Sequence, residues 1–295
     1  MEAQSKKVTK AVIPVAGFGS RMLPATKAIP KEMLPIIDKP LIQYIIEECS
    51  TAGITEIVMI THSYKSAIVN HFDVAFELEE SLSSKGKTEL LHTVRNTKPD
   101  ALDLTFVRQG QALGLGHAVL KAKQVIGNSP FAVILPDVLI DEHNSRVQFD
   151  NLKTMVENFE KTGASQIMVE EVADKDVSKF GIVDIGDATL EPGASTKMTR
   201  VVEKPALEDA PSNLAVVGRY IFTENLWPLL EKTEPGVGGE IQLTDAMDEL
   251  LRSEDVFAYY MHGKSHDCGN KRGYFKAILE YAKRHPDLAD LIINL

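Results

Sequence analysis

Short, almost continuously apolar runs alternate with helical patterns through the first half of the chain. Such runs are typical of strands buried on both faces of a parallel sheet, and three of them occur before residue 140, at 12–15, 56–61 and 131–137. Residues 103–109, which mix apolar and polar side chains, are expected to form a further strand. Between the runs, apolar residues recur at helical spacing, most regularly from Leu41 to Cys49, with Pro40 before them and Gly53 after them. This alternation predicts the α/β class, with a mixed, mostly parallel sheet flanked by helices.

The second half of the chain is less regular, with loops rich in Gly, Pro, Asp and Ser between its strands. Strands are expected at residues 165–172, 179–185, 198–204, 214–222 and 256–262. Helices are expected at residues 64–72, 74–95, 114–127, 149–161, 224–232, 242–252 and 271–284. There is no internal repeat or clear linker, so we expect one domain, 1–295, with a regular half, 8–140, and an elaborated half, 141–295.

The composition is that of an ordinary globular protein, with 295 residues of which 44% are hydrophobic and 25% charged. The formal net charge of −10 argues against non-specific nucleic-acid binding, which needs a basic surface. No apolar run is long enough to span a bilayer, and the first ten residues lack the apolar core of a signal peptide. Two cysteines, Cys49 and Cys268, give no disulfide framework and fit a reducing compartment. Together these observations predict a cytoplasmic protein with no membrane partner and no nucleic-acid partner.

The loop after the first strand combines glycines with cations, beginning with GFGSRM at residues 17–22. A dinucleotide-binding fingerprint needs a third glycine that opens a helix, but Met22 occupies that position and two prolines follow it. Open α/β sheets bind phosphorylated ligands beside the carboxyl ends of their strands. Arg21 and Lys31 supply charges that can hold phosphate oxygens, so we predict a phosphate site here and not a nicotinamide site.

A carboxylate, Asp137, ends the buried run 131–137. It is either a turn or helix-cap residue or a ligand for Mg²⁺. Since Mg²⁺ commonly takes one or two carboxylates plus phosphate oxygens of the substrate, Asp267, after the last strand, is the candidate second ligand.

Other charged groups carry weaker signals. Glu203 and Lys204 at a strand end are either a surface ion pair or a carboxylate for sugar hydroxyls beside a lysine for a phosphate. Residues 262–268 contain two histidines and a cysteine, but no other cluster completes a zinc site. GKS at 263–265 resembles the end of a P-loop without its leading glycine, and His117 is expected to be a packed or surface residue.

Nine segments occur in order along the chain: AGFGSRMLPATKAIPKEMLP, VRQ, GLGHAV, ILPD, FGIV, VVEKP, NLAVVGRY, GGEIQLTDA and HDCGN. From about residue 8 to 284 this pattern resembles the bacterial UTP–glucose-1-phosphate uridylyltransferases, a family of the sugar nucleotidyltransferase superfamily. The first segment is the most specific of the nine. Phe18 and Ser20 stand where Leu and Thr are common in the family, and Ser20 keeps the hydroxyl, so neither departure puts activity in doubt.

The resemblance implies a nucleotide-diphospho-sugar transferase fold, with a nucleotide-binding half at 8–140 and a sugar-binding half with C-terminal helices at 141–295. It implies transfer of uridylyl from UTP to glucose 1-phosphate, Mg²⁺ as the cofactor, and a homo-oligomer (dimer or tetramer). Two alternatives remain open, a non-catalytic regulatory paralogue and a related nucleotidyltransferase for another sugar or base. The regulatory alternative would predict loss of a site cation or aspartate, and none is lost.

The resemblance also implies a role for each site residue. The residues implied to contact the nucleotide are Ala16, Gly17, Gly19, Glu32, Gln109 and Gly114, the last two at the uracil edge. The residues implied to act on the phosphates and the metal are Arg21 and Lys31 for pyrophosphate, Lys204 for the sugar phosphate, and Asp137 and Asp267 for Mg²⁺. The residues implied to line the glucose pocket are Gly181, Glu203 and Gly218.

Overall fold

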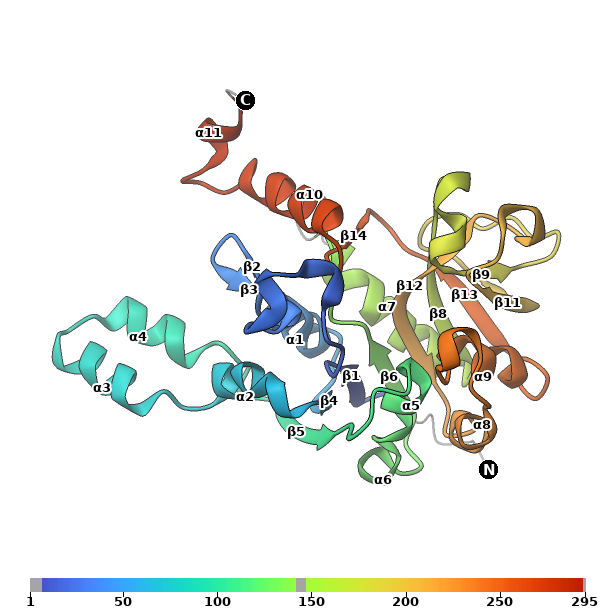
Figure 1. Ribbon diagram of the computed structural model, residues 1–295, viewed down its shortest axis with the longest axis horizontal. Coiled ribbons are helices and arrows are strands. Elements are labelled where there is room, and N and C mark those ends of the chain that lie inside the picture. Colours follow the sequence, from blue (N-terminus) through green and yellow to red (C-terminus); the bar gives the residue numbers. More distant parts are fainter. Residues whose placement is uncertain (1–6, 142–146, 294–295) are drawn as a thin grey trace.

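The computed structural model describes residues 7–141 and 147–293. Its main sheet has the strand order β10-β13-β8-β12-β6-β1-β4-β5, with helices packed against both faces (Figure 1). Along this path only β10 and β12 run against the other strands. The expected mixed, mostly parallel sheet flanked by helices is therefore confirmed.

The first half of the chain builds the parallel part of the sheet. Its strands are β1 (Lys10–Pro14), β4 (Glu56–Thr61), β5 (Asp103–Arg108) and β6 (Phe131–Ile134). β1 lies between β4 and β6, so that Val12 is in register with Val58 on one side and Val133 on the other. The carboxyl ends of these strands, and the loops that follow them, meet at one edge of the sheet.

The second half continues the same sheet. Its strands are β8 (Ser165–Glu171), β9 (Gly181–Asp184), β10 (Ser195–Lys197), β11 (Arg200–Glu203), β12 (Leu214–Phe222) and β13 (Val256–Tyr260). β12 joins the two halves, because it pairs antiparallel with β6 on one edge and with β8 on the other. β9 also pairs with β12, and β11 pairs with β9.

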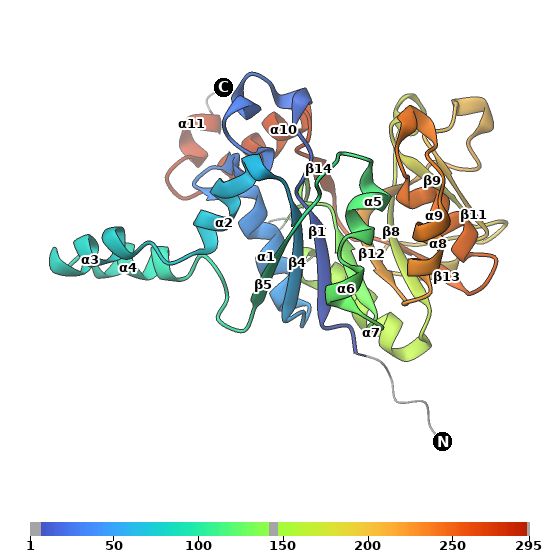
Figure 2. The same ribbon diagram turned by 60° about the horizontal axis from the view of Figure 1, so that its bottom comes forward.

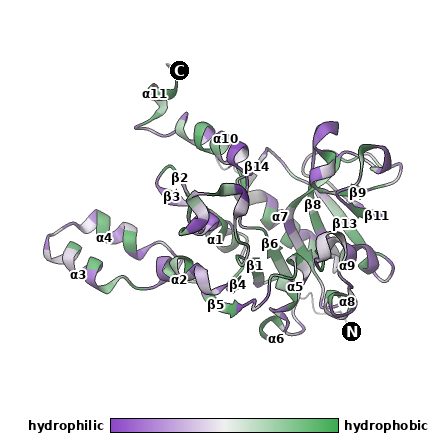
Figure 3. Cartoon of the chain, viewed as in Figure 1, coloured by the Kyte–Doolittle hydropathy of each residue, from purple (hydrophilic) through white to green (hydrophobic). Residues whose placement is uncertain are grey.

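Helices bury both faces of the sheet (Figure 2). One face carries α1 (Leu41–Thr51) and α7 (Val147–Thr162); the other carries α5 (Leu115–Leu120), α6 (Lys123–Ile126), α8 (Leu226–Lys232) and α9 (Leu243–Leu250). Successive side chains of a strand point to opposite faces. Ile13 therefore packs in the core that contains Ile45, whereas Val12 packs in the core that contains Val119. Figure 3 shows the apolar residues concentrated on the central strands.

The remaining elements lie around this framework. They are β2 (Pro35–Ile36), β3 (Lys39–Pro40), α2 (Ser66–Phe72), α3 (Phe76–Ser84), α4 (Thr88–Arg95), β7 (Val138–Ile140), β14 (Ser265–Asp267), α10 (Lys271–Ala282) and α11 (Ala289–Ile293). α3 and α4 are the polar helices expected at 74–95, and they lie side by side away from the sheet (Figures 1 and 2). Within the described ranges, no helix has the length and apolar character needed to cross a membrane.

Several features differ from the sequence-based expectation, and the short strands β2, β3 and β10 were not expected. The single helix expected at 114–127 is wrong, because it is divided into α5 and α6. At the junction the Ala122 N–H donates to the Val119 carbonyl at 2.9 Å, so the helix tightens to the three-residue spacing of a 3-10 turn. The pairing of β7 with β14 was not expected, since strands of three residues give almost no periodic signal.

Candidate active site

The loop after β1 consists of three single turns of 3-10 helix, Ser20–Met22, Ala25–Lys27 and Lys31–Met33. Gly19 begins it with a φ of 66°, and its carbonyl accepts a hydrogen bond from Thr26 Oγ1 at 2.7 Å. A Cβ on Gly19 would lie 3.3 Å from Lys31 Cβ, so glycine allows the loop to fold tightly. Beside it, a Cβ on Gly17 would meet no atom within 4 Å, which leaves that backbone open to a ligand.

The loop and the end of β6 meet in an ion pair. Lys31 Nζ donates to Asp137 Oδ2 at 2.6 Å, and both side chains are largely buried. Burial raises the pKa of Asp137, but Lys31 and then Arg21 more than offset this, so the pKa lies below the usual value. Burial likewise lowers the pKa of Lys31, but Asp137 and then Glu32 outweigh it, so this pKa is raised. Both groups are therefore charged at neutral pH.

The pairing of β7 with β14 brings Asp267 to Asp137. Asp267 is in register with Val138, and the Cys268 N–H donates to the Asp137 carbonyl at 2.7 Å. The Asp267 carboxylate accepts from the Gly269 N–H at 2.9 Å and from Asn270 Nδ2 at 2.8 Å. Two residues 130 positions apart in the sequence thus present their carboxylates together.

Gly269 shows how closely the charged groups converge. A Cβ there would lie 2.5 Å from Asp137 Oδ2, 2.7 Å from Arg21 NH2 and 3.0 Å from Asp267 Oδ1. Arg21 is the most open member, with a side chain 62% exposed and contacts of 3.8 Å to Asp137 and 3.9 Å to Asp267. Its guanidinium is therefore available to a phosphorylated ligand.

The donor set fits a hard divalent cation better than zinc. Two carboxylates converge, whereas no group of three or more His, Cys, Asp or Glu side chains gathers anywhere in the described part of the chain. Mg²⁺ is commonly held by one or two carboxylates together with substrate phosphates. Asp137 and Asp267 are the residues that would hold it.

Glu32 is held in a buried ion pair with Lys65. Its carboxylate is fully buried, and Lys65 Nζ donates to Oε2 at 2.8 Å, while Oε1 has no hydrogen-bond partner. Burial raises the pKa of Glu32, and Lys65 and Lys31 offset only part of this effect. Glu32 thus ties the 3-10 turn that carries Lys31 to the loop after β4, and its contact with the nucleoside stays a prediction.

Gln109 and Gly114 lie together beyond β5. Gln109 Nε2 donates to the Gly114 carbonyl at 3.2 Å and lies 2.9 Å from His117 Nδ1. Burial, with Lys121 second, lowers the pKa of His117, so its ring is neutral at pH 7 and Nδ1 can accept this bond. The amide nitrogen is therefore engaged, which leaves Gln109 Oε1 as the group that can accept from a ligand.

The sugar-side candidates gather around β9 and β11. Glu203 Oε2 accepts from Thr244 Oγ1 at 2.7 Å, and Glu203 Oε1 lies 3.0 Å from Lys204 Nζ. A Cβ on Gly181 would lie 3.5 Å from Glu203 Oε2 and 3.6 Å from Thr244 Oγ1, so Gly181, Glu203 and Thr244 are close neighbours. Lys204 has a left-handed φ of 45°, a strained conformation for a residue other than glycine.

Gly218 lies where β12 changes register, between Val216 and Tyr220. It has a φ of 76°, and a Cβ there would lie 2.9 Å from Leu135 Cβ. Glycine therefore allows β12 to approach the turn that carries Asp137. This contact explains its place in the site, while its contact with glucose stays a prediction.

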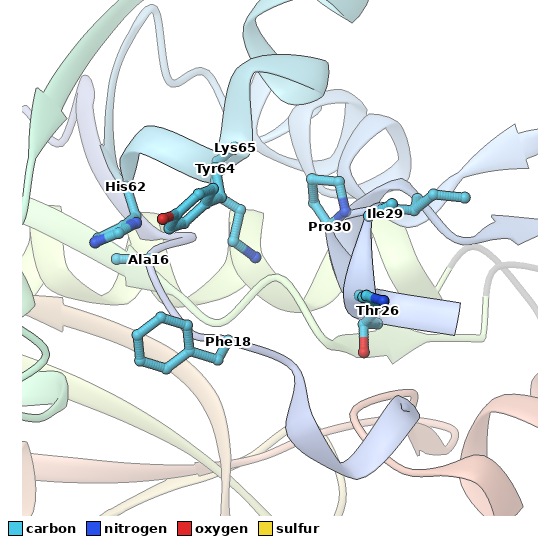
Figure 4. A pocket seen from close by; sticks show the side chains of 10 residues that line it. Ala16, Phe18, Thr26, Ile29, Pro30, His62, Tyr64 and Lys65 are labelled. Carbon is cyan, nitrogen blue, oxygen red and sulfur yellow. The ribbon is translucent and has the colours of Figure 1, made fainter. Parts of the chain in front are cut away.

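A cavity of about 200 Å³ opens between the loop after β1 and the loop after β4 (Figure 4). Its lining residues include Ala16, Phe18, Lys27, His62, Tyr64 and Lys65. The rings of Phe18 and His62 pack edge to face, and those of His62 and Tyr64 are stacked. Ala16 lies at the wall of this cavity, beside the open backbone of Gly17.

Sequence reasoning missed four residues that shape the site. They are Lys65, Arg219, Thr244 and Gly269. Arg219, Thr244 and Gly269 lie inside segments already singled out, but their partners are distant in sequence. An arginine within an otherwise apolar strand is the signal that could have found Arg219, because a buried charge needs a partner. Lys65 lies between Tyr64 and Ser66, so its sequence neighbours give no such signal.

Comparisons with known proteins agree with this geometry. The family model described as nucleotidyl transferase matches residues 10–284. A UTP–glucose-1-phosphate uridylyltransferase of Escherichia coli K12 is 59% identical over 288 residues, which cover 98% of this chain and 95% of the relative. The same enzyme of Haemophilus influenzae is 56% identical over 279 residues, covering 95% of each protein.

Solved structures agree as well. The UTP-bound enzyme of Acinetobacter baumannii superposes with a TM-score of 0.90 at 46% identity, covering 98% of this chain and 99% of that one. A UDP-glucose pyrophosphorylase complexed with UDP-glucose superposes with a TM-score of 0.82 at 41% identity, covering 94% of this chain and 100% of that one. The chain belongs to the nucleotidyl transferase family, in the branch of the bacterial UTP–glucose-1-phosphate uridylyltransferases.

Proposed function

We propose that the protein transfers a uridylyl group from UTP to glucose 1-phosphate, giving UDP-glucose and pyrophosphate. The observation that carries the proposal is the convergence of Arg21, Lys31, Asp137 and Asp267 at the end of β6. Relatives as similar as 59% over nearly the whole chain bear the name of this activity.

A phosphate oxygen of glucose 1-phosphate attacks the α-phosphorus of UTP in line with the departing pyrophosphate. The nucleophile is already an anion, so the reaction needs no general base. The obstacle is the approach of two polyanions, which positioning and charge neutralisation overcome. Arg21 and Lys31 would hold the pyrophosphate, and Lys204 would hold the sugar phosphate from the other side.

Mg²⁺, when bound, would neutralise charge on the phosphates. Asp137 and Asp267 would hold it, and Lys31 would then exchange its 2.6 Å contact with Asp137 for a phosphate oxygen. Arg21 is already exposed, so it can reach a phosphate without breaking a buried contact.

Polar groups on either side of the Asp137–Lys31 ion pair would select the substrates. Gln109 Oε1 would accept from the N3–H of uracil, which cytosine lacks, because Nε2 is held by Gly114 and His117. Glu203, held by Thr244, would accept from glucose hydroxyls.

The test is pyrophosphate release from a panel of nucleoside triphosphates and sugar 1-phosphates, with and without Mg²⁺. We expect Mg²⁺-dependent turnover with UTP and glucose 1-phosphate. In Gln109→Ala the preference for UTP over CTP should fall about 10-fold or more, as for loss of one well-placed hydrogen bond. Faster turnover of another pair by the wild type would contradict the assignment.

We also propose a homo-oligomer. Val74 and Phe76, at the start of the outlying α3–α4 pair, are more than 70% exposed, and burial of large apolar side chains against another subunit would stabilise short helices that lie away from the core. Light scattering of the full chain tests this proposal, and a monomer at all concentrations would contradict it.

A further inference from the structure

Arg219, in β12, is among the largest fully buried side chains of the described chain, and no step above uses it. It forms a bidentate ion pair with Glu48 of α1, from Nε to Oε1 at 2.9 Å and from NH2 to Oε2 at 2.7 Å. Burying two charges costs free energy even when they pair well, and a hydrophobic pair often replaces them without loss. The ion pair by itself therefore does not explain why an arginine lies here.

The remaining N–H groups of Arg219 reach the turn that carries Asp137. NH1 donates to the Leu135 carbonyl at 3.2 Å, and NH2 donates to the Val138 carbonyl at 2.9 Å. These two carbonyls flank Asp137 on either side. Glu48 holds the guanidinium plane in the orientation that both bonds require.

The rest of the turn is held by neighbouring backbone. The Leu135 N–H donates to the Gly218 carbonyl at 2.8 Å, and the Cys268 N–H donates to the Asp137 carbonyl at 2.7 Å. Pro136 has no N–H to satisfy. The three carbonyls from Leu135, Asp137 and Val138 all have partners, and two of those partners come from one side chain, Arg219.

We infer that Arg219, oriented by Glu48, is a positioning residue that holds the Asp137 turn in the geometry its carboxylate needs to bind the metal. The inference rests on the proposed function, in which Asp137 holds Mg²⁺. Groups that orient a metal ligand without touching the metal commonly affect metal affinity 10–100-fold or so. Arg219 acts through carbonyls on both sides of the ligand. Its loss therefore loosens the backbone at Asp137 and leaves the charge of the Asp137 carboxylate unchanged.

The test compares Arg219→Lys with a double variant, Glu48→Leu with Arg219→Met. Lysine keeps a cation beside Glu48, but a single ammonium cannot also bridge both carbonyls. The double variant removes both charges and is expected to retain the fold. Tyr259→Phe is the matched control, because it removes a buried 3.0 Å hydrogen bond to Asn151 on the α7 face, outside the site.

Two measurements are made on each folded variant: the Mg²⁺ concentration that gives half-maximal pyrophosphate release, and Mn²⁺ binding in the presence of UDP-glucose, followed by electron paramagnetic resonance. In Arg219→Lys and in the double variant, we expect the half-maximal Mg²⁺ concentration to rise about 10-fold or more and the affinity for Mn²⁺ to fall by a similar factor. Saturating Mg²⁺ should restore most of the rate. Tyr259→Phe should lower the melting temperature only.

Wild-type metal dependence in the two variants would overturn the positioning role, as would a rate loss that Mg²⁺ does not restore. If Arg219→Lys does not fold, the double variant alone decides. A wild-type protein with no Mg²⁺-dependent turnover would instead overturn the proposed function, so the two failures are distinguishable.

Discussion

The two sides of the Lys31–Asp137 contact are built differently. On the acidic side, the turn from Leu135 to Val138 is bonded to β12, to the Arg219 side chain and to the chain after β14. On the basic side, the backbone hydrogen bonds within residues 19–34 join residues only three positions apart. The main contacts of that loop with distant parts of the chain are two side-chain ion pairs, Lys31 with Asp137 and Glu32 with Lys65.

The difference separates two tasks. A metal ligand must keep one geometry, and a backbone bonded from three directions supplies it. Groups that receive a departing polyanion must follow it, and the loop can do so without breaking any strand pairing. We therefore expect substitutions on the acidic side to be more harmful than those on the basic side.

The largest expected effect is that of Asp137→Asn, which keeps the shape of the side chain but removes its charge. We predict a fall in kcat/KM of about 10³-fold, because a metal ligand and the partner of Lys31 are lost together. Steady-state pyrophosphate release across a range of Mg²⁺ concentrations measures it. Activity within tenfold of wild type would remove Asp137 from the catalytic machinery.

Gly269→Ala comes next. Its Cβ would lie 2.5 Å from Asp137 Oδ2, so the carboxylates must move apart, and a misplacement of that size costs about 100-fold in kcat/KM. Gly186→Ala is the control, because that turn has a φ of 60° but open space around it. The control should lose some thermal stability and keep its activity; equal losses of activity would refute the steric explanation.

Arg21→Lys tests the basic side. We predict a loss of only about 10-fold in kcat/KM, the equivalent of one charge-assisted hydrogen bond, because a flexible lysine can still reach the phosphates. The assay is the same as for Asp137→Asn. A loss as large as that of Asp137→Asn would show that the basic side is as intolerant as the acidic side, and the comparison would fail.

The smallest effect concerns stability and pH. The pKa of Asp137 is lowered in the folded protein, so its contribution is complete above its ordinary value of 3.8 and is lost as the pH falls through the folded value. The unfolding free energy of wild type should exceed that of Asp137→Asn by about 1 kcal/mol near neutral pH, and this difference should shrink below about pH 4. Urea unfolding measures it, and a difference that grows on acidification would contradict the sign.

Much of the site could be predicted because its residues lie in continuous segments. Arg21 and Lys31 follow a buried strand, and Asp137 ends another, so the topology of a parallel sheet places them at one edge. Glu32 shows the limit of this reasoning. The resemblance implies a contact of Glu32 with the nucleoside, but its buried ion pair with Lys65 of a different loop could not be predicted from the sequence.

The sequence by itself determined the α/β class, the order of most elements and the chemistry of the phosphate loop, because these follow from local periodicity and residue type. The sequence also named Asp267 as the candidate partner of Asp137, but only the tertiary structure showed the β7–β14 pairing that brings the two together. Only the tertiary structure decided that Thr244 holds Glu203 and that Arg219 holds the Asp137 turn. These contacts join residues that lie 41 to 130 positions apart in the sequence. The ion pair of Arg219 with Glu48 also connects α1 to β12 and to the Asp137 turn. Such pairings are selected by the packing of the whole fold, which no local pattern encodes.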